Sequence, residues 1–272
     1  MPDRTDLPLI TMARPSIEAL RTEIRRADAA YRAGTPLISD EQFDNLVAQL
    51  RASAPYAPEL AHPGGGTALL SLDNCSMADW YHSIAVVPAV VVQPKIDGIA
   101  IAIRYKAGIL TDAWTRSGKC ILPLVRQVSA IPQIIREGGV IEIHGELFGT
   151  APGKSQTDAA QAARANSRLR EATKTDARVE RKLDFYAYRL HDATGTESTS
   201  LETISRLGIK VVDSLLCTKP VEVARLHSKW LDAQLFTHWP TDGIVVKVHD
   251  HKLQQQLGAS TVAPRWALAL KR

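Results

Sequence analysis

Cysteine is scarce in this sequence, aromatic residues are few, and no long hydrophobic run is present. The three cysteines lie far apart without a Cys-x-x-Cys or Cys/His pair, so we expect neither a disulfide framework nor a structural zinc site. No apolar run reaches the length of a membrane span, and the first fifteen residues mix charges with prolines instead of forming a secretion signal. These absences argue against a membrane partner and favour a cytoplasmic protein.

The chain has enough apolar content for one sizeable domain and a small accessory unit. Of its 272 residues, 45% are hydrophobic and 23% are charged, and the formal net charge is +4. This mild basic excess suits ligands that carry phosphate. It is smaller than the excess typical of proteins that bind nucleic acid tightly.

The N-terminal part predicts a pair of helices. Apolar residues recur at helical spacing from Ser16 to about Ser53, and a break at Gly34, Thr35 and Pro36 divides this stretch in two. Residues 54–66, rich in Pro and Gly, indicate a linker. We therefore expect a helical hairpin domain over residues 1–62 and a main domain over residues 63–272.

The main domain has the sequence pattern of strands mixed with helices. A Lys106-Ala107-Gly108 turn between two alternating runs indicates a β-hairpin. Antiparallel hairpins mixed with helices predict an α+β fold rather than a doubly wound sheet. The expected strands cover residues 86–93, 99–105, 109–115, 140–148, 183–189 and 243–249, and the expected helices cover 158–182, 201–207 and 221–234.

The strongest chemical signal follows the first apolar strand, where Lys95 and Asp97 stand two residues apart before Gly98. On extended backbone this spacing places both side chains on one face. Gly98 permits a conformation or a close approach that a side chain would hinder. Desolvation and neighbouring cations make a lysine in such a place a reasonable nucleophile. The alternative is a surface lysine beside a turn aspartate.

Three further charges lie on or beside apolar strands, where an unpaired charge is costly. Glu146 follows residues 140–144, Lys247 closes the run 242–247, and Lys271 closes the run 266–271. Lys95, Lys247 and Lys271 could converge on one phosphate and stabilise a charged phosphoryl transition state. Taken singly, each lysine could also be a chain that reaches solvent at a sheet edge.

With these motifs the sequence resembles the bacterial NAD-dependent DNA ligases, within the lysine-adenylating nucleotidyltransferases. The resemblance runs from about Ile17 to the last residue, and it implies an ATP-grasp-like ligase adenylation domain for the main part. Its most specific stretches are Leu70-Ser71-Leu72-Asp73-Asn74, the Lys95 segment and Thr241 through Lys271. Within the last stretch, the runs Gln255-Gln256-Leu257-Gly258 and Ala263-Pro264-Arg265-Trp266-Ala267 are especially similar to the family.

The resemblance implies that Lys95 attacks the AMP phosphorus of NAD, releases nicotinamide mononucleotide (NMN) and forms lysyl-AMP. Asp97 would support nucleotide transfer, Glu146 would contact the ribose, and Lys247 and Lys271 would hold the AMP phosphate. Mg²⁺ or Mn²⁺ would assist, although no dedicated metal cage is visible in the sequence. The remaining nucleotide contacts implied are Ser71, Leu72, Gln93, Arg116 and Arg164.

In this family the N-terminal hairpin covers the NMN half of NAD, and ATP-dependent relatives lack it. Tyr31, Asp40 and Asp44 stand at the positions of the nicotinamide-binding residues. An aromatic ring can stack on nicotinamide, and carboxylates can bond ribose hydroxyls or face the cationic ring. Apart from the resemblance, Tyr31 would be a core aromatic residue and Asp40 a helix cap.

The sequence departs from the family pattern at several positions. Arg32 replaces a histidine, Phe43 a tyrosine and Gln93 a glutamate, and the loop after Arg116 loses its acidic, Gly-rich continuation. The amide of Gln93 still offers an acceptor for the adenine amino group. These features are more similar to the shorter, second type of bacterial NAD-dependent ligase.

The sequence ends where the family continues into domains that encircle DNA. Nicked DNA is therefore expected as a partner through missing or separate domains, and the chain itself is expected to be monomeric. Two alternatives stay open: a non-catalytic module that binds nucleotide or a partner, and a standalone adenylyltransferase acting on RNA or protein.

Overall fold

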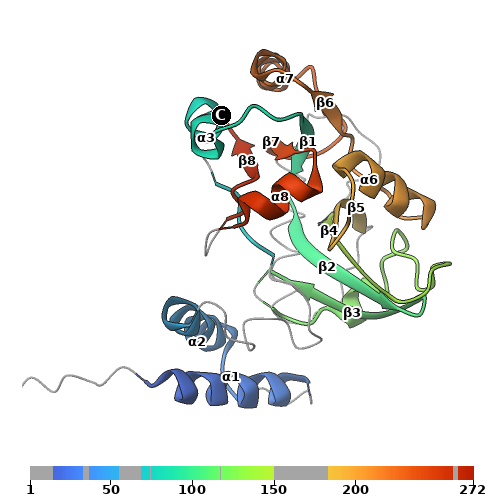
Figure 1. The fold of residues 1–272 in the computed structure, drawn as a ribbon. Helices are drawn as coiled ribbons and strands as arrows, with labels where there is room; N and C mark the ends of the chain where they lie inside the picture. Colours follow the sequence, from blue (N-terminus) through green and yellow to red (C-terminus); the bar gives the residue numbers. More distant parts are fainter. Residues whose placement is uncertain are drawn as a thin grey trace, which may run out of the picture. The chain divides into compact units, whose positions relative to one another are not determined.

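The computed structural model describes residues 15–32, 37–54, 69–73, 75–116, 118–149, 183–259 and 263–272. The chain divides into two compact units, Met1–Pro63 and Gly64–Arg272, and most of their elements are labelled in Figure 1. Within the described ranges, no helix is both long and apolar enough to cross a membrane.

The first unit contains the two predicted helices, α1 (Ile17–Arg32) and α2 (Asp40–Ser53). Ser39 caps α2: its hydroxyl accepts from the Gln42 backbone N–H, and the Gln42 side chain accepts from the Ser39 backbone N–H. The two helices pack through a small apolar core around Leu20, Ile24 and Leu50. The predicted helical pair is confirmed, whereas its break at 34–36 and most of the linker lie outside the described residues.

The second unit contains two four-stranded sheets in which all neighbouring strands are antiparallel, which confirms the α+β prediction. One sheet has the order β6-β1-β7-β8 and the other the order β3-β2-β4-β5. The strands are β1 (Val90–Ile96), β2 (Ile99–Lys106), β3 (Ile109–Thr115), β4 (Val140–Gly149), β5 (Leu183–Leu190), β6 (Leu215–Cys217), β7 (Thr241–Val248) and β8 (Ala267–Leu270).

Strand β1 differs from its predicted span of 86–93, because it starts at Val90 and continues through Pro94 to Ile96. Its pairing with β6 ends at Val92, so among the strands that the structure describes Pro94 has a neighbour only on the β7 side. Proline is tolerated in a strand where its missing N–H faces no ladder partner. The predicted hairpin is confirmed as β2 and β3.

The described helices of this unit are α3 (Met77–Ile84), α4 (Leu122–Val125), α6 (Glu197–Arg206), α7 (Pro220–Leu231) and α8 (His251–Leu257). Helix α6 begins four residues before its predicted start, because Thr196 caps it and accepts from the Thr199 backbone N–H. Helix α7 ends at Leu231, short of the predicted residue 234. The predicted helix over 158–182 lies outside the described residues.

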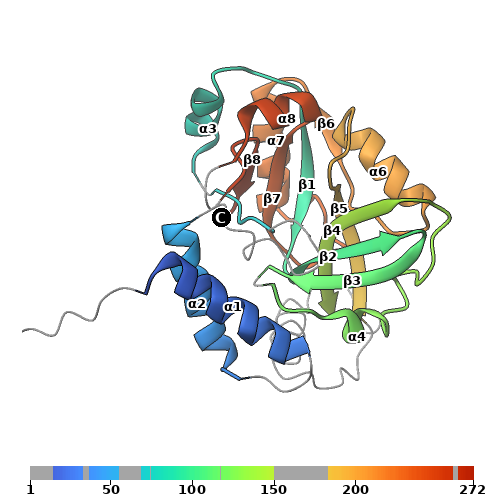
Figure 2. The same ribbon diagram turned by 60° about the horizontal axis from the view of Figure 1, so that its bottom comes forward.

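The chain passes from one sheet to the other between β1 and β2, at Asp97 and Gly98 (Figure 2). A Cβ at Gly98 would lie 2.5 Å from the Leu147 carbonyl oxygen and 2.9 Å from Glu146 Cγ. The predicted need for a close approach at Gly98 is therefore confirmed. This contact brings the end of β1, with Lys95, next to the middle of β4, with Glu146.

Candidate active site

A cavity of about 380 Å³ is lined by residues of both sheets and of α8. The sequence-predicted residues that line it come from β1, β4, β7, the end of β3 and the segment before α3. They are Leu72, Gln93, Lys95, Arg116, Glu146 and Lys247. Ser71, Asp97 and Lys271 do not line the cavity themselves, and each is located below by its own contacts.

Lys95 and Lys271 meet at Asp242, and we call these three residues the Asp242 cluster. Asp242 Oδ1 accepts a hydrogen bond from Lys95 Nζ at 2.7 Å, and Oδ2 lies 3.0 Å from Lys271 Nζ. The strand register explains this meeting, because Lys95 stands opposite Gly243 and Lys271 directly follows β8. Burial raises the pKa of Asp242, but the hydrogen bonds and the positive charges of the two lysines together lower it below its usual value. The cluster therefore holds an ionised carboxylate between two ammonium groups.

Sequence reasoning did not assign a role to Asp242. A signal was available, because Asp242-Gly243 opens an apolar strand that ends in a lysine. Placing this strand antiparallel to the Lys95 strand would have put Asp242 beside Lys95. The pairing of two strands about 150 residues apart is not encoded in either segment alone.

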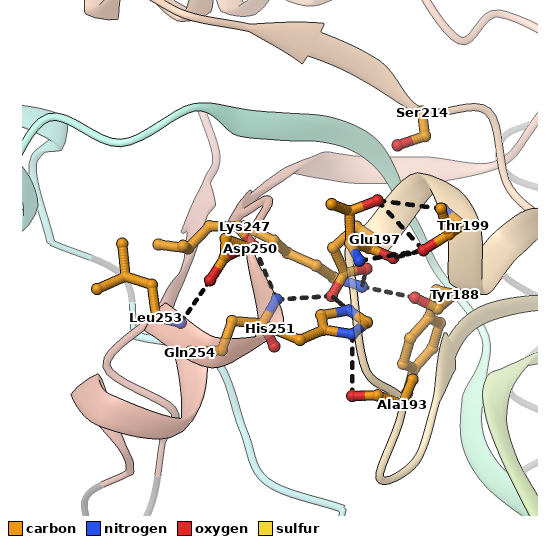
Figure 3. Close-up of polar contacts among 12 residues, drawn as sticks. Tyr188, Ala193, Glu197, Thr199, Ser214, Lys247, Asp250, His251, Leu253 and Gln254 are labelled. Carbon is orange, nitrogen blue, oxygen red and sulfur yellow. Dashed lines mark hydrogen bonds and ion pairs between the residues drawn. The ribbon is translucent and has the colours of Figure 1, made fainter.

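Lys247 is not brought into the Asp242 cluster. It lies on the same face of β7 as Gly243 but four residues along, which corresponds to about 13 Å of strand. It pairs in register with Val91. Its ammonium is buried, donates to the Tyr188 carbonyl oxygen at 2.6 Å and lies 3.5 Å from Glu197 Oε2 (Figure 3). Lys95 and Lys271 thus meet at one carboxylate and Lys247 lies apart from them, while the expected contact of the three lysines with one phosphate stays a prediction.

Glu146 lies on β4 opposite Ala100 and close to the Asp242 cluster. Burial raises the pKa of Glu146 to about 8, although the positive charges of Arg116 and Lys95 lower it. The negative charges of Asp97 and Asp242 raise it further. Two carboxylates, Asp97 and Glu146, therefore lie near Lys95.

The segment before α3 contacts the end of β3. Arg116 Nη1 donates to Ser71 Oγ at 3.3 Å, and both Leu72 and Arg116 line the cavity. The segment is tied to β8, because the Ala269 backbone N–H donates to the Asp73 carbonyl at 2.9 Å. Two stretches singled out from the sequence therefore form one wall of the cavity.

Gln93 lies on β1 two residues before Lys95 and is only 1% exposed. Its Nε2 donates to Ser214 Oγ at the long distance of 3.5 Å. Its buried Oε1 has no hydrogen-bond partner within the described part of the chain. A buried acceptor without a partner costs free energy, so this atom suits a ligand that brings an N–H donor, such as the amino group of adenine.

A second polar cluster, formed by Glu142, His144 and His191, has metal-ligand atoms within 4.8 Å of one another. Glu142 already accepts from Arg104 Nη2 and from His144 Nε2, each at 2.8 Å. Burial raises the pKa of Glu142, but these two hydrogen bonds and the nearby charges bring it down to about 2. The Glu142 charge is therefore balanced by protein groups without a cation.

Four predicted site residues fall outside what the structure describes. Tyr31 lies in α1, and Asp40 and Asp44 lie in α2, but their side chains are outside the described part of the chain. Arg164 lies wholly outside the described residues. Their roles stay predictions.

Comparison with known proteins shows which family this chain resembles over most of its length. Residues 65–272 match the family model described as NAD-dependent DNA ligase adenylation domain. The chain is 30% identical over 302 residues to a DNA ligase of Natranaerobius thermophilus, covering 94% of this chain and 46% of that protein. It is also 30% identical over 321 residues to a DNA ligase of Prochlorococcus marinus strain NATL2A, with the same two coverages.

The chain thus spans about half the length of the curated relatives it matches. The family match covers both sheets and every described residue of the cavity wall. On this match, the chain belongs to the family of NAD-dependent DNA ligase adenylation domains.

Proposed function

We propose that this chain carries out the self-adenylation step of an NAD-dependent DNA ligase, with Lys95 as the nucleophile. The observation that carries the proposal is the position of Lys95, which lines a nucleotide-sized cavity and is held by Asp242 at 2.7 Å. The Lys95 Nζ–P bond forms as the bond between the AMP phosphorus and the NMN phosphate oxygen breaks. Asp242 Oδ1 is placed to take the proton that Nζ must lose.

The cavity and the residues beside it offer groups suited to each part of AMP. Gln93 Oε1 would accept from the adenine amino group, and Glu146 would bond the ribose. Lys271, which shares Asp242 with Lys95, would place its positive charge beside the phosphate. Arg116 would close the wall formed with Ser71. Attack in line with the leaving group requires this fixed orientation.

The residues near Lys95 also fit a divalent cation. Asp97 supplies carboxylate oxygens, which are the ligands that Mg²⁺ and Mn²⁺ prefer when substrate phosphates complete the shell. We propose that Asp97 would hold the cation together with phosphate oxygens of the nucleotide. Bound there, it would neutralise charge on the transferring phosphoryl group.

The rest of the reaction depends on the first unit and on partners. We propose that Tyr31, Asp40 and Asp44 hold the NMN half of NAD. The acceptor of AMP would be the 5′-phosphate of nicked DNA, engaged through further domains. The chain would act as a monomer in the cytoplasm without a membrane partner.

The test is a mass measurement after incubation with NAD and Mg²⁺. The chain should gain the mass of one AMP, and Lys95→Ala should gain none. Lys106→Ala, which removes a half-exposed lysine at the end of β2, should gain AMP as the unaltered chain does. A gain from ATP but not from NAD would refute the assigned donor. The absence of any adduct in the unaltered chain would refute the proposed function.

A further inference from the structure

Glu197 lies behind the cavity wall and meets three residues that line the cavity. It is only 1% exposed and is not itself a lining residue. Its Oε1 accepts from Gln254 Nε2 at 2.7 Å and lies 3.4 Å from His251 Nε2, and its Oε2 lies 3.5 Å from Lys247 Nζ. Figure 3 shows these groups directed toward one carboxylate.

Backbone hydrogen bonds fix the position of this carboxylate. The Glu197 N–H donates to the His249 carbonyl at 2.9 Å, and the His251 N–H donates to the Gly195 carbonyl at 3.0 Å. His251 Nδ1 lies 3.1 Å from the Ala193 carbonyl oxygen, which can only accept, so this nitrogen is the donor. The start of α6 is thereby attached to the end of β7 and to the start of α8.

The carboxylate is the charge partner of a buried ammonium. Lys247 is 4% exposed, and among the described residues Glu197 is the one carboxylate within ion-pair distance of its Nζ. Tyr188 contributes a carbonyl acceptor and a ring face, and Arg189, also on β5, adds a second positive charge. Removing one partner of such a pair leaves an uncompensated buried charge.

The direction of each electrostatic effect agrees with this geometry. Burial lowers the pKa of Lys247, Glu197 raises it, Arg189 lowers it, and the net shift is downward. Burial raises the pKa of Glu197, but Lys247, His251, Gln254 and Arg189 together bring it down to about 2. Glu197 is therefore ionised at neutral pH and opposes the loss of the Lys247 proton.

We propose that Glu197 is a positioning residue of the nucleotide pocket, which holds Lys247 in place and keeps it charged. The pocket then presents a fixed cation at the end away from the Asp242 cluster. This inference rests on the proposed function for the identity of the ligand, whereas the charge state of Lys247 can be measured without it. A purely structural role for Glu197, joining α6 to α8, would leave the Lys247 titration unchanged.

Glu197→Gln tests the proposal because the amide keeps the shape and removes the charge. The first measurement is the titration of Lys247 followed by NMR of its ¹³Cε and ¹⁵Nζ nuclei, assigned with Lys247→Arg. In Glu197→Gln, Lys247 should lose its proton at least one pH unit lower than in the unaltered chain. Glu202→Gln, which neutralises an exposed carboxylate on the same helix, should leave the titration unchanged. Equal titrations in Glu197→Gln and the unaltered chain would overturn the proposal.

The second measurement is lysyl-AMP formation in single turnover between pH 6 and pH 9. Glu197→Gln should raise the NAD concentration for half-maximal rate about tenfold at pH 8 and above, and much less at pH 6, because its Lys247 discharges as the pH rises. The maximal rate should change less than threefold. A pH-independent rise would indicate a structural role and overturn the proposal. If the unaltered chain forms no adduct, the proposed function fails, while the NMR titration still decides the role of Glu197.

A paired substitution covers the case in which Glu197→Gln does not fold. Lys247→Met leaves the carboxylate without its ammonium, whereas Lys247→Met with Glu197→Gln leaves neither charge unpaired. The double variant should unfold at a higher temperature than either single variant. If the double variant is no more stable than the singles, the two charges are not paired and the proposal fails.

Discussion

Asp242 links the proposed nucleophile to a second cation, because its two oxygens contact the ammonium groups of Lys95 and Lys271. The lysines are recognisable in the sequence as charges at the ends of apolar strands. The position of Asp242 between these lysines follows only from the register in which β7 pairs with β1 and β8. At the scale of single residues, the sequence thus predicts the charged groups of the site better than it predicts their partners.

Replacing Asp242 should lower the rate of lysyl-AMP formation much more than it weakens the binding of NAD. Asp242→Asn removes the proton acceptor but keeps the size of the side chain, so lysyl-AMP formation should slow about 10²-fold. The half-saturating NAD concentration should change much less. Single-turnover mass measurements would give both quantities, and Asp232→Asn, at the exposed end of α7, is the matched control. An unchanged rate in Asp242→Asn would exclude Asp242 from proton transfer.

Glu146 should make the protein less stable as the pH rises. Its pKa of about 8 exceeds the ordinary value near 4.3, so the folded state binds more protons than the unfolded state between these pH values. The free energy of unfolding therefore falls across this window. Glu146→Gln removes this dependence, so its melting temperature should exceed that of the unaltered chain increasingly from pH 5 to pH 8 without added nucleotide. A constant difference across this range would contradict the shifted pKa.

At the scale of elements, local sequence signals predict that a helix or a strand exists, and which of the two it is, more reliably than they predict the residues where it begins and ends. The predicted β2–β3 hairpin is confirmed. It could be predicted because three consecutive residues form its turn. Helix α6 starts earlier than predicted because residues 196–200 are Ser- and Thr-rich and lack apolar periodicity. Its first residue is Glu197, whose buried position depends on partners in β7 and α8. The residues near Glu197 in the sequence do not include these partners, so a local pattern could not predict that Glu197 is buried.

The β1–β2 connection should tolerate no side chain at Gly98. An added Cβ would lie within 3.0 Å of Leu147, Glu146 and Phe148, which include backbone that cannot move alone. Gly98→Ala should therefore lower the free energy of unfolding by about 1–3 kcal/mol, and it should slow adduct formation because Lys95 moves relative to β4. Denaturant unfolding measures the first effect. Gly138→Ala, where a Cβ would meet nothing within 4 Å, is the control. Equal stabilities would show that the two sheets separate easily at this point.

At the scale of the whole chain, sequence order does not reveal which charges share a site. Lys247 follows the family pattern in the sequence, yet it lies about 13 Å along β7 from the residue opposite Lys95. Lys247 lines the cavity and is buried against Glu197, apart from the Asp242 cluster, and its expected contact with the phosphate stays a prediction. The packing of the two sheets and α8 around one cavity places Lys95 at one end of the pocket and Lys247 at the other, which the order of the residues in the sequence does not show.

The division into two units leads to a prediction about the donor. The first unit packs through Leu20, Ile24 and Leu50, whereas the two large cores of the second unit are built from residues after Gly64. Each unit thus has an apolar core of its own, and residues 64–272 should fold without the first unit. Because Tyr31, Asp40 and Asp44 belong to the first unit, deleting residues 1–63 should remove the proposed contacts to NMN.

The shortened chain should still bind AMP, because Gln93, Lys95 and Glu146 remain around the cavity. Its rate of lysyl-AMP formation from NAD should fall at least 10²-fold, since the leaving group is no longer held in line. Calorimetry with AMP and single-turnover mass measurements with NAD separate these two effects. Unchanged adduct formation would show that the first unit does not bind NMN. Loss of AMP binding would show instead that the pocket needs the first unit to form.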